Sequence, residues 1–231
     1  FSVNPRLGIY KCFGCGAGGD ALSFIMKTEN RDFMDVIIEL AERFGLEVPL
    51  KKKKLVSKEL KDQMISACQK ATEYYNTYLL QDKSSDTLKV MEYLTNRGIT
   101  KDIIQTYSLG LAPKSYQSLY DLLKAKFSDE VLEKAGLIIS SKTGYIDRFR
   151  NRLIIPIVNE YGENVAFGAR AIEADQMPKY LNSSDSLIYN KSKLLFGLYT
   201  AKDAIKEEDS VILMEGYFDV ISAQAHGIEN A

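Results

Sequence analysis

The residues best suited to chemistry in this chain of 231 residues lie near its carboxyl end, in Ser210-Val-Ile-Leu-Met-Glu-Gly-Tyr-Phe-Asp-Val220. Val211 to Met214 is a short apolar run that predicts a buried strand. Glu215 and a glycine follow, and a helical pattern then runs from Tyr217 to His226. An acid at the carboxyl end of a strand in an open α/β sheet faces the crevice where ligands bind, and it suits Mg²⁺ shared with phosphate groups. The same pattern also fits an ordinary strand-to-helix turn whose exposed glutamate has no role.

A second reactive group is the pair Cys12 and Cys15, which stands in a glycine-rich turn after a predicted hairpin. Such a Cys-x-x-Cys turn supplies half of a tetrahedral zinc site, because glycines let backbone amides turn toward the sulfurs. A redox motif is the alternative, but the glycines fit a zinc knuckle better than the start of a helix. Cys68 is predicted to lie in a helix, so we expect the other zinc ligands before Phe1.

A third group is basic. Asp147-Arg-Phe-Arg-Asn-Arg152 is predicted to place three arginines at alternate positions, on one side of an extended segment. Arg170 ends another predicted strand, and Lys179 and Lys191 flank a segment with one tyrosine and small polar residues. Cations in this setting suit a phosphate backbone. A solvated sheet face with weak surface ion pairs is the alternative interpretation.

The elements that must position these groups follow from hydrophobic spacing and turn residues. Asp20 is predicted to cap one helix, and a second helix is predicted to end at Gly45. A long helix is expected from Ser57 to Gln81. Shorter helices are expected over residues 86–97, 100–107, 115–126, 128–134 and 198–206, and strands over residues 1–4, 137–139, 152–158, 164–171 and 179–181.

Composition narrows the class of protein. The formal net charge of −1 gives no global argument for a nucleic-acid partner, so any such case depends on local clusters. No apolar stretch is long enough for a membrane span, and three unevenly spaced cysteines do not make a disulfide framework. No signal peptide precedes the first residues, and we expect a cytosolic, reduced protein. A start without Met and a stop at Ala231 suggest a fragment.

These motifs together resemble those of the bacterial DNA primase family (DnaG type), over almost the whole chain. Tyr10-Lys-Cys-Phe-Gly-Cys-Gly-Ala-Gly-Gly-Asp20 is similar to the second half of that family's zinc-binding domain. The remaining motifs resemble those of its polymerase domain and stand in the family's order. They are Tyr93-Leu-Thr-Asn-Arg-Gly-Ile99, Asp147-Arg-Phe-Arg150, Phe167-Gly-Ala-Arg170, Pro178-Lys-Tyr-Leu-Asn-Ser183, Leu195-Phe-Gly-Leu-Tyr199 and Glu215-Gly-Tyr-Phe-Asp219.

The resemblance implies a multidomain protein of mixed α+β and α/β class. Residues 1–49 would be the carboxyl-terminal part of the zinc-binding domain, a zinc-ribbon-like remnant. Residues 50–57, with four consecutive lysines, would be a basic linker. Residues 58–205 would form the mixed helical and β amino-terminal subdomain of the polymerase core, and residues 206–231 the start of a toprim (Rossmann-like) module.

The resemblance also implies roles for particular residues. Glu215 would be the first acid linked to a catalytic Mg²⁺ or Mn²⁺, Asp219 a further acid of the same motif, and Cys12 and Cys15 two ligands of a structural Zn²⁺. We expect the Asp-x-Asp acids of the toprim module beyond Ala231. The basic residues that match the groove for template and nucleotide are Arg97, Arg148, Arg150, Arg170, Lys179 and Lys191, and Arg152 is added from its spacing alone.

The implied function is synthesis of short RNA primers on a single-stranded DNA template from ribonucleoside triphosphates, by metal-dependent nucleotidyl transfer during DNA replication. The implied place is the cytoplasm, at the replication fork in the nucleoid, with no membrane partner. A replicative helicase would bind through a region outside this chain. One alternative is a fragment that binds single-stranded DNA without catalysis. Another is a different toprim enzyme, a topoisomerase or nuclease, against which the zinc knuckle and Pro178 to Ser183 argue.

Overall fold

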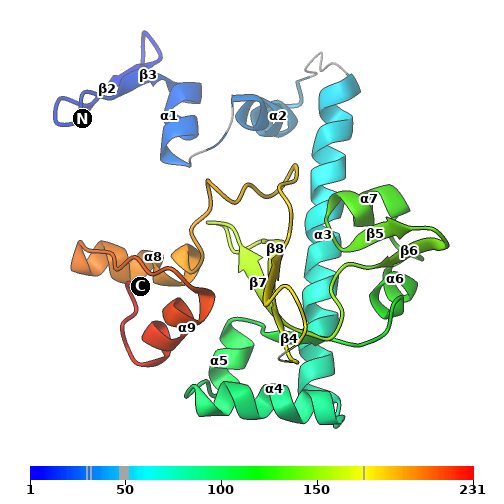
Figure 1. Cartoon of the computed structure of the whole chain (residues 1–231). Helices are drawn as coiled ribbons and strands as arrows, with labels where there is room; N and C mark the ends of the chain where they lie inside the picture. Colours follow the sequence, from blue (N-terminus) through cyan, green and yellow to red (C-terminus); the bar gives the residue numbers. More distant parts are fainter. Residues whose placement is uncertain (30, 32, 47–51, 174) are drawn as a thin grey trace. The chain divides into compact units, whose positions relative to one another are not determined.

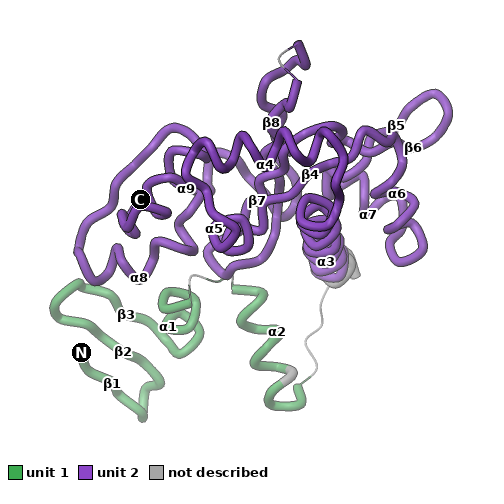
Figure 2. Tube along the Cα trace, turned by 90° about the horizontal axis from the view of Figure 1, so that it is seen from below, with its two compact units in different colours: residues 1–56 green, residues 57–231 purple. Residues whose placement is uncertain are grey.

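The structure, a computed structural model, describes residues 1–29, 31, 33–46, 52–173 and 175–231. The chain divides into two compact units, Phe1–Val56 and Ser57–Ala231 (Figure 2). Part of the predicted basic linker, residues 50 and 51, lies outside the described residues, and residues 52–57 belong to helix α3 (Lys52–Gln81). That helix therefore begins five positions before the predicted Ser57. No helix in the described ranges is long and apolar enough to cross a membrane.

The first unit contains a three-stranded antiparallel sheet of β1 (Ser2–Asn4), β2 (Ile9–Lys11) and β3 (Gly18–Asp20). Two helices follow, α1 (Ala21–Thr28) and α2 (Phe33–Phe44). The predicted cap is confirmed, because Asp20 Oδ1 accepts a hydrogen bond from the Ser23 N–H at 2.7 Å. Tyr10 is buried on β2, and its ring meets Phe24 of α1 edge-on, with centroids 5.1 Å apart. This contact joins the small sheet to its first helix.

The second unit is built on a four-stranded antiparallel sheet in the order β4-β7-β8-β9 (Figure 1). Its strands are β4 (Gly110–Ala112), β7 (Arg152–Val158), β8 (Asn164–Ala171) and β9 (Tyr180–Asn182). The bounds of β7 and β8 agree with the predicted ones. A separate hairpin pairs β5 (Ile138–Ser141) with β6 (Gly144–Asp147).

Helices cover both faces of this sheet, and successive residues of β7 pack on opposite sides of it. Ile154 joins the cluster around α3, whereas Leu153 and Ile155 join the cluster formed with the other helices. All residues of β7 except Val158 are buried, and after Arg152 the strand is apolar throughout, as expected for a strand that is covered on both faces. The remaining helices are α4 (Ser85–Asn96), α5 (Lys101–Thr106), α6 (Ser118–Leu123), α7 (Asp129–Lys134), α8 (Leu198–Glu208) and α9 (Tyr217–Ala225).

The predicted strand Val211–Met214 is not formed. Val211, Ile212 and Leu213 are 51%, 42% and 73% exposed, respectively. The Ile212 N–H donates to the Asn230 carbonyl oxygen at 3.0 Å, but no ladder of such bonds follows. A strand is defined by pairing with a neighbour, and within the described part of the chain no strand lies beside this segment. The prediction of a buried strand is therefore wrong, because an apolar run forms a strand only where a partner strand lies beside it.

Candidate functional site

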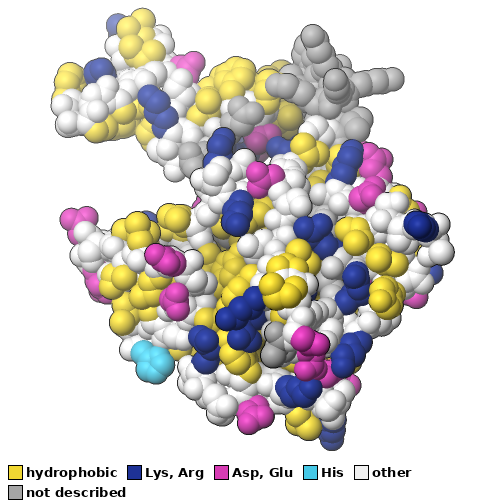
Figure 3. All heavy atoms as spheres, viewed as in Figure 1, with side chains coloured by type: hydrophobic (Ala, Val, Ile, Leu, Met, Phe, Trp, Pro, Cys, Tyr) yellow, Lys and Arg dark blue, Asp and Glu magenta, His cyan; other side chains and the backbone are white. Residues whose placement is uncertain are grey.

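Several predicted site residues meet in one pocket of the second unit, with a volume of about 450 Å³. Arg97 reaches it from the end of α4, Lys191 from the loop after β9, and Glu215 and Asp219 from the start of α9. These four side chains are exposed, so their charges face solvent. Tyr180, Asn182, Tyr189 and Phe196 add aromatic and polar walls. Figure 3 shows Lys and Arg side chains spread over the face that it draws, with Asp and Glu side chains among them.

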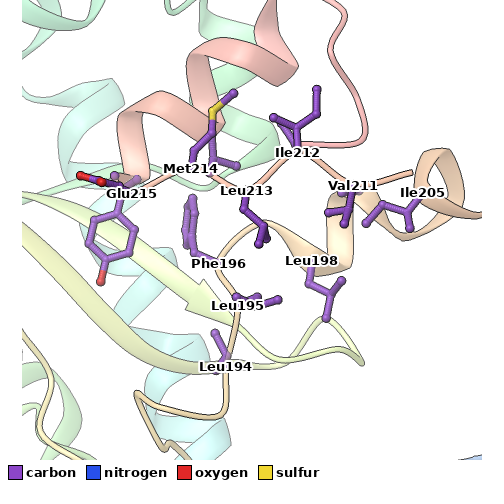
Figure 4. A pocket seen from close by; sticks show the side chains of 15 residues that line it. Leu194, Leu195, Phe196, Leu198, Ile205, Val211, Ile212, Leu213, Met214 and Glu215 are labelled. Carbon is purple, nitrogen blue, oxygen red and sulfur yellow. The ribbon is translucent and has the colours of Figure 1, made fainter. Parts of the chain in front are cut away.

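The two acids lie at the amino-terminal end of α9. Glu215 directly precedes Gly216, the N-cap, and Asp219 lies in the first helical turn. A Cβ built on Gly216 would lie 2.7 Å from Asp219 Oδ2, so the Asp219 carboxylate folds back over the Gly216 backbone. Glu215 also lines a neighbouring, mainly apolar pocket with Leu195, Phe196 and Leu213, and Figure 4 shows it at one end of that pocket. Both acids line the pocket that also contains Arg97 and Lys191.

These acids fit a magnesium ion that is shared with a substrate. Mg²⁺ in phosphate-transferring sites uses one or two carboxylates and takes its other ligands from phosphate oxygens and water. Among the residues that the structure describes, no cluster of three or more acids, cysteines or histidines could enclose a metal ion. Glu215 and Asp219 therefore suit a phosphate-bridging metal and do not form a closed metal site of protein ligands.

Tyr217 ties the acid segment to the sheet. Its hydroxyl donates to Asn182 Oδ1 at 3.1 Å, and its ring meets Phe196 edge-on with centroids 4.9 Å apart. A Cβ at Gly168 of β8 would lie 2.7 Å from Tyr217 Cε2, so only glycine leaves room for the ring. Burial raises the pKa of Tyr217 to about 12, which keeps its hydroxyl protonated as a donor. Sequence reasoning missed this link, although a glycine inside a strand signals a close approach.

Arg97 and Arg170 share one aromatic ring. The guanidinium carbon of Arg170 lies 4.0 Å from the ring centroid of Tyr93, and that of Arg97 lies 4.9 Å from the same centroid. Arg97 also lies 5.4 Å from the ring centroid of Phe218 on α9. The structure thus brings Arg170 close to Arg97, which lines the pocket with the acids.

Arg148, Arg150 and Arg152 do not share one side of an extended segment, and this prediction is wrong. Asn151 has φ of +50°, which breaks the alternation on which it depended. Arg148 donates to the Asn182 carbonyl oxygen at 3.0 Å and to Ser184 Oγ at 3.2 Å. The other two arginines also turn to the protein itself. Arg150 bonds the Asp147 carbonyl oxygen and lies over the Tyr116 ring, whereas Arg152 is buried and donates to the Pro178 carbonyl oxygen at 2.8 Å.

The two predicted lysines lie on either side of β9. Lys179 is exposed directly before Tyr180, and its carbonyl oxygen accepts a hydrogen bond from the Ala171 N–H at 2.9 Å. Lys191 is exposed in the loop after β9, where its N–H donates to Asp185 Oδ1 at 2.9 Å. Backbone bonds thus fix both positions while the ammonium groups stay in solvent.

The cysteine pair lies in the first unit, in the turn between β2 and β3. The Cys12 N–H donates to the Ala17 carbonyl oxygen at 2.7 Å, and the Gly16 N–H donates to the Cys12 carbonyl oxygen at 3.0 Å. Hydrogen bonds from the Cys15 backbone, then from the Cys15 side chain and the Gly14 backbone, lower the pKa of Cys12. A thiolate that accepts backbone hydrogen bonds is the form that zinc binds. The turn fits half of a tetrahedral zinc site.

Comparisons with known proteins agree on one family. Residues 74–202 match the family model "DNA primase catalytic core, N-terminal domain", and residues 1–56 match the model "CHC2 zinc finger". A DNA primase from Synechocystis is 40% identical over 99% of this chain and 37% of its own length. A DNA primase from Aquifex aeolicus is 37% identical over 100% of this chain and 44% of its own length. The chain thus spans less than half the length of these curated relatives.

Solved structures give the same result. The zinc-binding and RNA polymerase domains of Aquifex aeolicus primase match with a TM-score of 0.68 and 37% identity, over 99% of this chain and 54% of that one. The RNA polymerase domain of Mycobacterium tuberculosis primase DnaG matches with a TM-score of 0.69 and 32% identity, over 73% of this chain and 55% of that one. A DnaG primase catalytic domain bound to single-stranded DNA matches with a TM-score of 0.67 and 26% identity, over 74% and 53%.

Proposed function

The chain belongs to the DnaG-type DNA primase family. On that premise we propose that it is part of an enzyme that makes short RNA primers on single-stranded DNA. The substrates are ribonucleoside triphosphates, and the reaction is nucleotidyl transfer. One observation carries the proposal beyond the family. The exposed cations Arg97 and Lys191 line the same pocket as the exposed acids Glu215 and Asp219. A phosphate-bearing substrate that is also bound through a metal needs both kinds of group.

The acids and the cations have different tasks in this proposal. Glu215 and Asp219 would hold the metal at the start of α9. When bound there, Mg²⁺ or Mn²⁺ would supply Lewis-acid activation of the α-phosphate and stabilise the pyrophosphate leaving group. Arg97 and Lys191 hold phosphate oxygens and neutralise the charge that develops on them. Tyr217 fixes the acid segment against Gly168 and Asn182, so that the acids keep their position when the substrate binds.

The first unit would bind a structural zinc ion through Cys12 and Cys15. The match of residues 1–56 to a zinc-finger family supports zinc binding by this unit. The lowered pKa of Cys12 supports its role as a thiolate ligand. We assign the two cysteines as ligands of the same ion.

A DNA template is the partner with the most support. The DnaG primase catalytic domain that was solved with single-stranded DNA matches 74% of this chain. The RNA primer would occupy the same groove as the product. A replicative helicase as partner and a place at the replication fork in the cytoplasm follow from the proposed activity. The primase relatives weigh against a topoisomerase or a nuclease.

The test is primer synthesis by the full-length protein on single-stranded DNA, with labelled ribonucleotides and Mg²⁺. Glu215→Gln keeps the size of the side chain but removes the charge that binds the metal, so we expect at least a 100-fold loss of RNA product. Glu207→Gln on α8 is the matched control, because Glu207 is exposed and lies outside the pocket. No RNA from a folded, zinc-loaded parent on several templates would overturn the proposal.

A further inference from the structure

Tyr93 of α4 contacts two arginines but has no role in the proposed function so far. The guanidinium groups of Arg170 on β8 and of Arg97 at the end of α4 both lie over its ring. Tyr93 and Arg97 are four residues apart, so they lie on the same face of the helix. The ring also meets Phe218 edge-on, with centroids 5.6 Å apart. Tyr93, Arg97, Arg170 and Phe218, from α4, β8 and α9, therefore form one group of contacting side chains beside the pocket.

The two guanidinium groups in this stack lack an anionic partner. Among the described residues, neither Arg97 nor Arg170 has a carboxylate within salt-bridge distance, although Lys89, on the same helix as Tyr93, pairs with Glu173 at 2.9 Å. Their guanidinium carbons lie 4.0 Å and 4.9 Å from the same ring centroid, and two cations on one ring suit a site that receives an anion.

The aromatic ring is what fixes these cations. Arg170 Nε is buried and has no hydrogen-bond partner in the described parts of the chain, and the same holds for the Tyr93 hydroxyl. Burial raises the pKa of Tyr93, while the positive charges of Arg170 and Arg97 oppose that shift, so the two charges act on the ring. Stacking on an aromatic face orients a planar guanidinium group and does not neutralise it.

We propose that Tyr93 is a positioning residue, which holds Arg97 and Arg170 as a pair that binds phosphate. This inference rests on the proposed function and deepens it, because it names the residue that aligns the basic side of the site. The ligand is a phosphate group, from either the DNA backbone or the triphosphate of a nucleotide. Phe218 supports the ring from α9, so the phosphate pair and the metal-binding acids share one support.

The test measures binding of this chain to a fluorescent oligodeoxythymidine by anisotropy over a series of salt concentrations. Replacing the ring by Tyr93→Leu should weaken binding about five-fold to thirty-fold. It should also lower the slope of log K against log salt by about 0.7 for each phosphate contact that is lost. Tyr93→Phe keeps the ring and should bind like the parent. Competition by ATP, repeated with each variant, distinguishes the triphosphate from the DNA backbone as the ligand.

Two further variants separate positioning from stability. Tyr107→Leu removes a ring from the same hydrophobic cluster, but Tyr107 contacts neither arginine, so it should lower stability and leave the salt slope unchanged. Arg97→Lys, at an exposed position that does not threaten folding, keeps the charge but loses planar stacking and should also weaken binding. If the parent does not bind DNA or ATP, the proposed function fails. If the parent binds and Tyr93→Leu keeps its affinity and slope, or Arg97→Lys binds like the parent, the role of Tyr93 is wrong.

Discussion

Three cysteines of one chain differ in reactivity because of where each lies. Cys68 is fully buried on α3, and burial raises the pKa of its thiol to about 12. Cys15 is exposed, and Cys12 is half-buried with a lowered pKa. Only thiolates react readily with disulfide reagents. Cys68, which lies outside the zinc knuckle, should therefore be the unreactive cysteine of the folded chain.

We expect a disulfide reagent to modify two thiols of the native, zinc-free chain and the third only after unfolding. Absorbance of the released thiolate counts the modified groups. Bound Zn²⁺ should protect both reactive thiols, since its ligands are no longer free to attack. Native modification of all three thiols at one rate would contradict the burial of Cys68, and no protection by Zn²⁺ would contradict the knuckle.

At the scale of single elements, the amino-terminal end of α4 depends on an ionised aspartate. Asp82 accepts hydrogen bonds from the Ser84 N–H at 2.9 Å and from Thr87 Oγ1 at 2.7 Å. Bonds from the Ser84 side chain, the Thr87 side chain and the Ser84 N–H lower the pKa of Asp82 from 3.8 to about 2. Ser84 is itself the N-cap of the helix. The carboxylate thus organises the turn that leads into α4, which carries Tyr93 and ends next to Arg97.

This arrangement predicts a pH dependence of stability. The folded pKa lies below the unfolded one, so the contribution of Asp82 is fully present above pH 3.8 and is lost as the pH falls toward about 2. Asp82→Asn should therefore reduce the fall in unfolding free energy between pH 4 and pH 2, measured by urea titration at each pH. The exposed Asp203→Asn on α8 is the control. An unchanged pH dependence in Asp82→Asn would show that this turn does not form as described.

The contact between β8 and α9 makes a second prediction for elements. Gly168→Ala would place a methyl group 2.7 Å from the Tyr217 ring and push it, with the neighbouring Glu215, away from the sheet. A displacement of about 1 Å at a catalytic group can cost about 100-fold in rate, so primer synthesis by the full-length protein should fall by about that factor. Circular dichroism should remain native. Tyr217→Phe, which loses only the bond to Asn182, should cost less, and equal losses would reject the steric argument.

The elements also show what the sequence could predict and what it could not. The strands β7 and β8 and the Asp20 cap follow from local patterns, namely apolar runs bounded by turn residues and the side-chain chemistry of a capping aspartate. The strand Val211–Met214 depended on a partner, and the arginine row depended on a backbone that Asn151 bends at φ of +50°. Of the site residues that the family motifs predicted, Arg97, Lys191, Glu215 and Asp219 line the pocket, whereas the aromatic residues of its wall were not predicted. Its support by Tyr217, Gly168 and Tyr93 depends on packing between distant segments, which no local pattern encodes.

At the scale of the whole molecule, the two units have separate cores. Among the described residues, the hydrophobic clusters on the two faces of the four-stranded sheet contain only residues of the second unit, and the buried Tyr10 of the first unit packs on Phe24 of the same unit. The cysteine knuckle belongs to the first unit alone. Removal of zinc should therefore change the first unit without loosening the second.

We expect a calorimetric scan of the zinc-loaded chain to show two transitions. A chelator should lower the temperature of one transition and leave that of the second unit unchanged, because the zinc ligands contribute nothing to its core. Cys12→Ser should reproduce the effect without chelator, whereas Cys68→Ala should lower only the other transition. A single transition that shifts as a whole would show that the two units unfold together.

The position of β7 also has a consequence for how this chain can vary. Six of its seven residues are buried, and strands β4 and β8 flank it on both edges. Most strands keep one face where substitutions are tolerated, but β7 has no such face. In a library of random variants selected for folding, the residues of β7 should accept the fewest substitutions. The same positions should also vary least among related sequences. Strand β7, at the centre of the sheet, is therefore the part of the chain in which we expect the fewest substitutions.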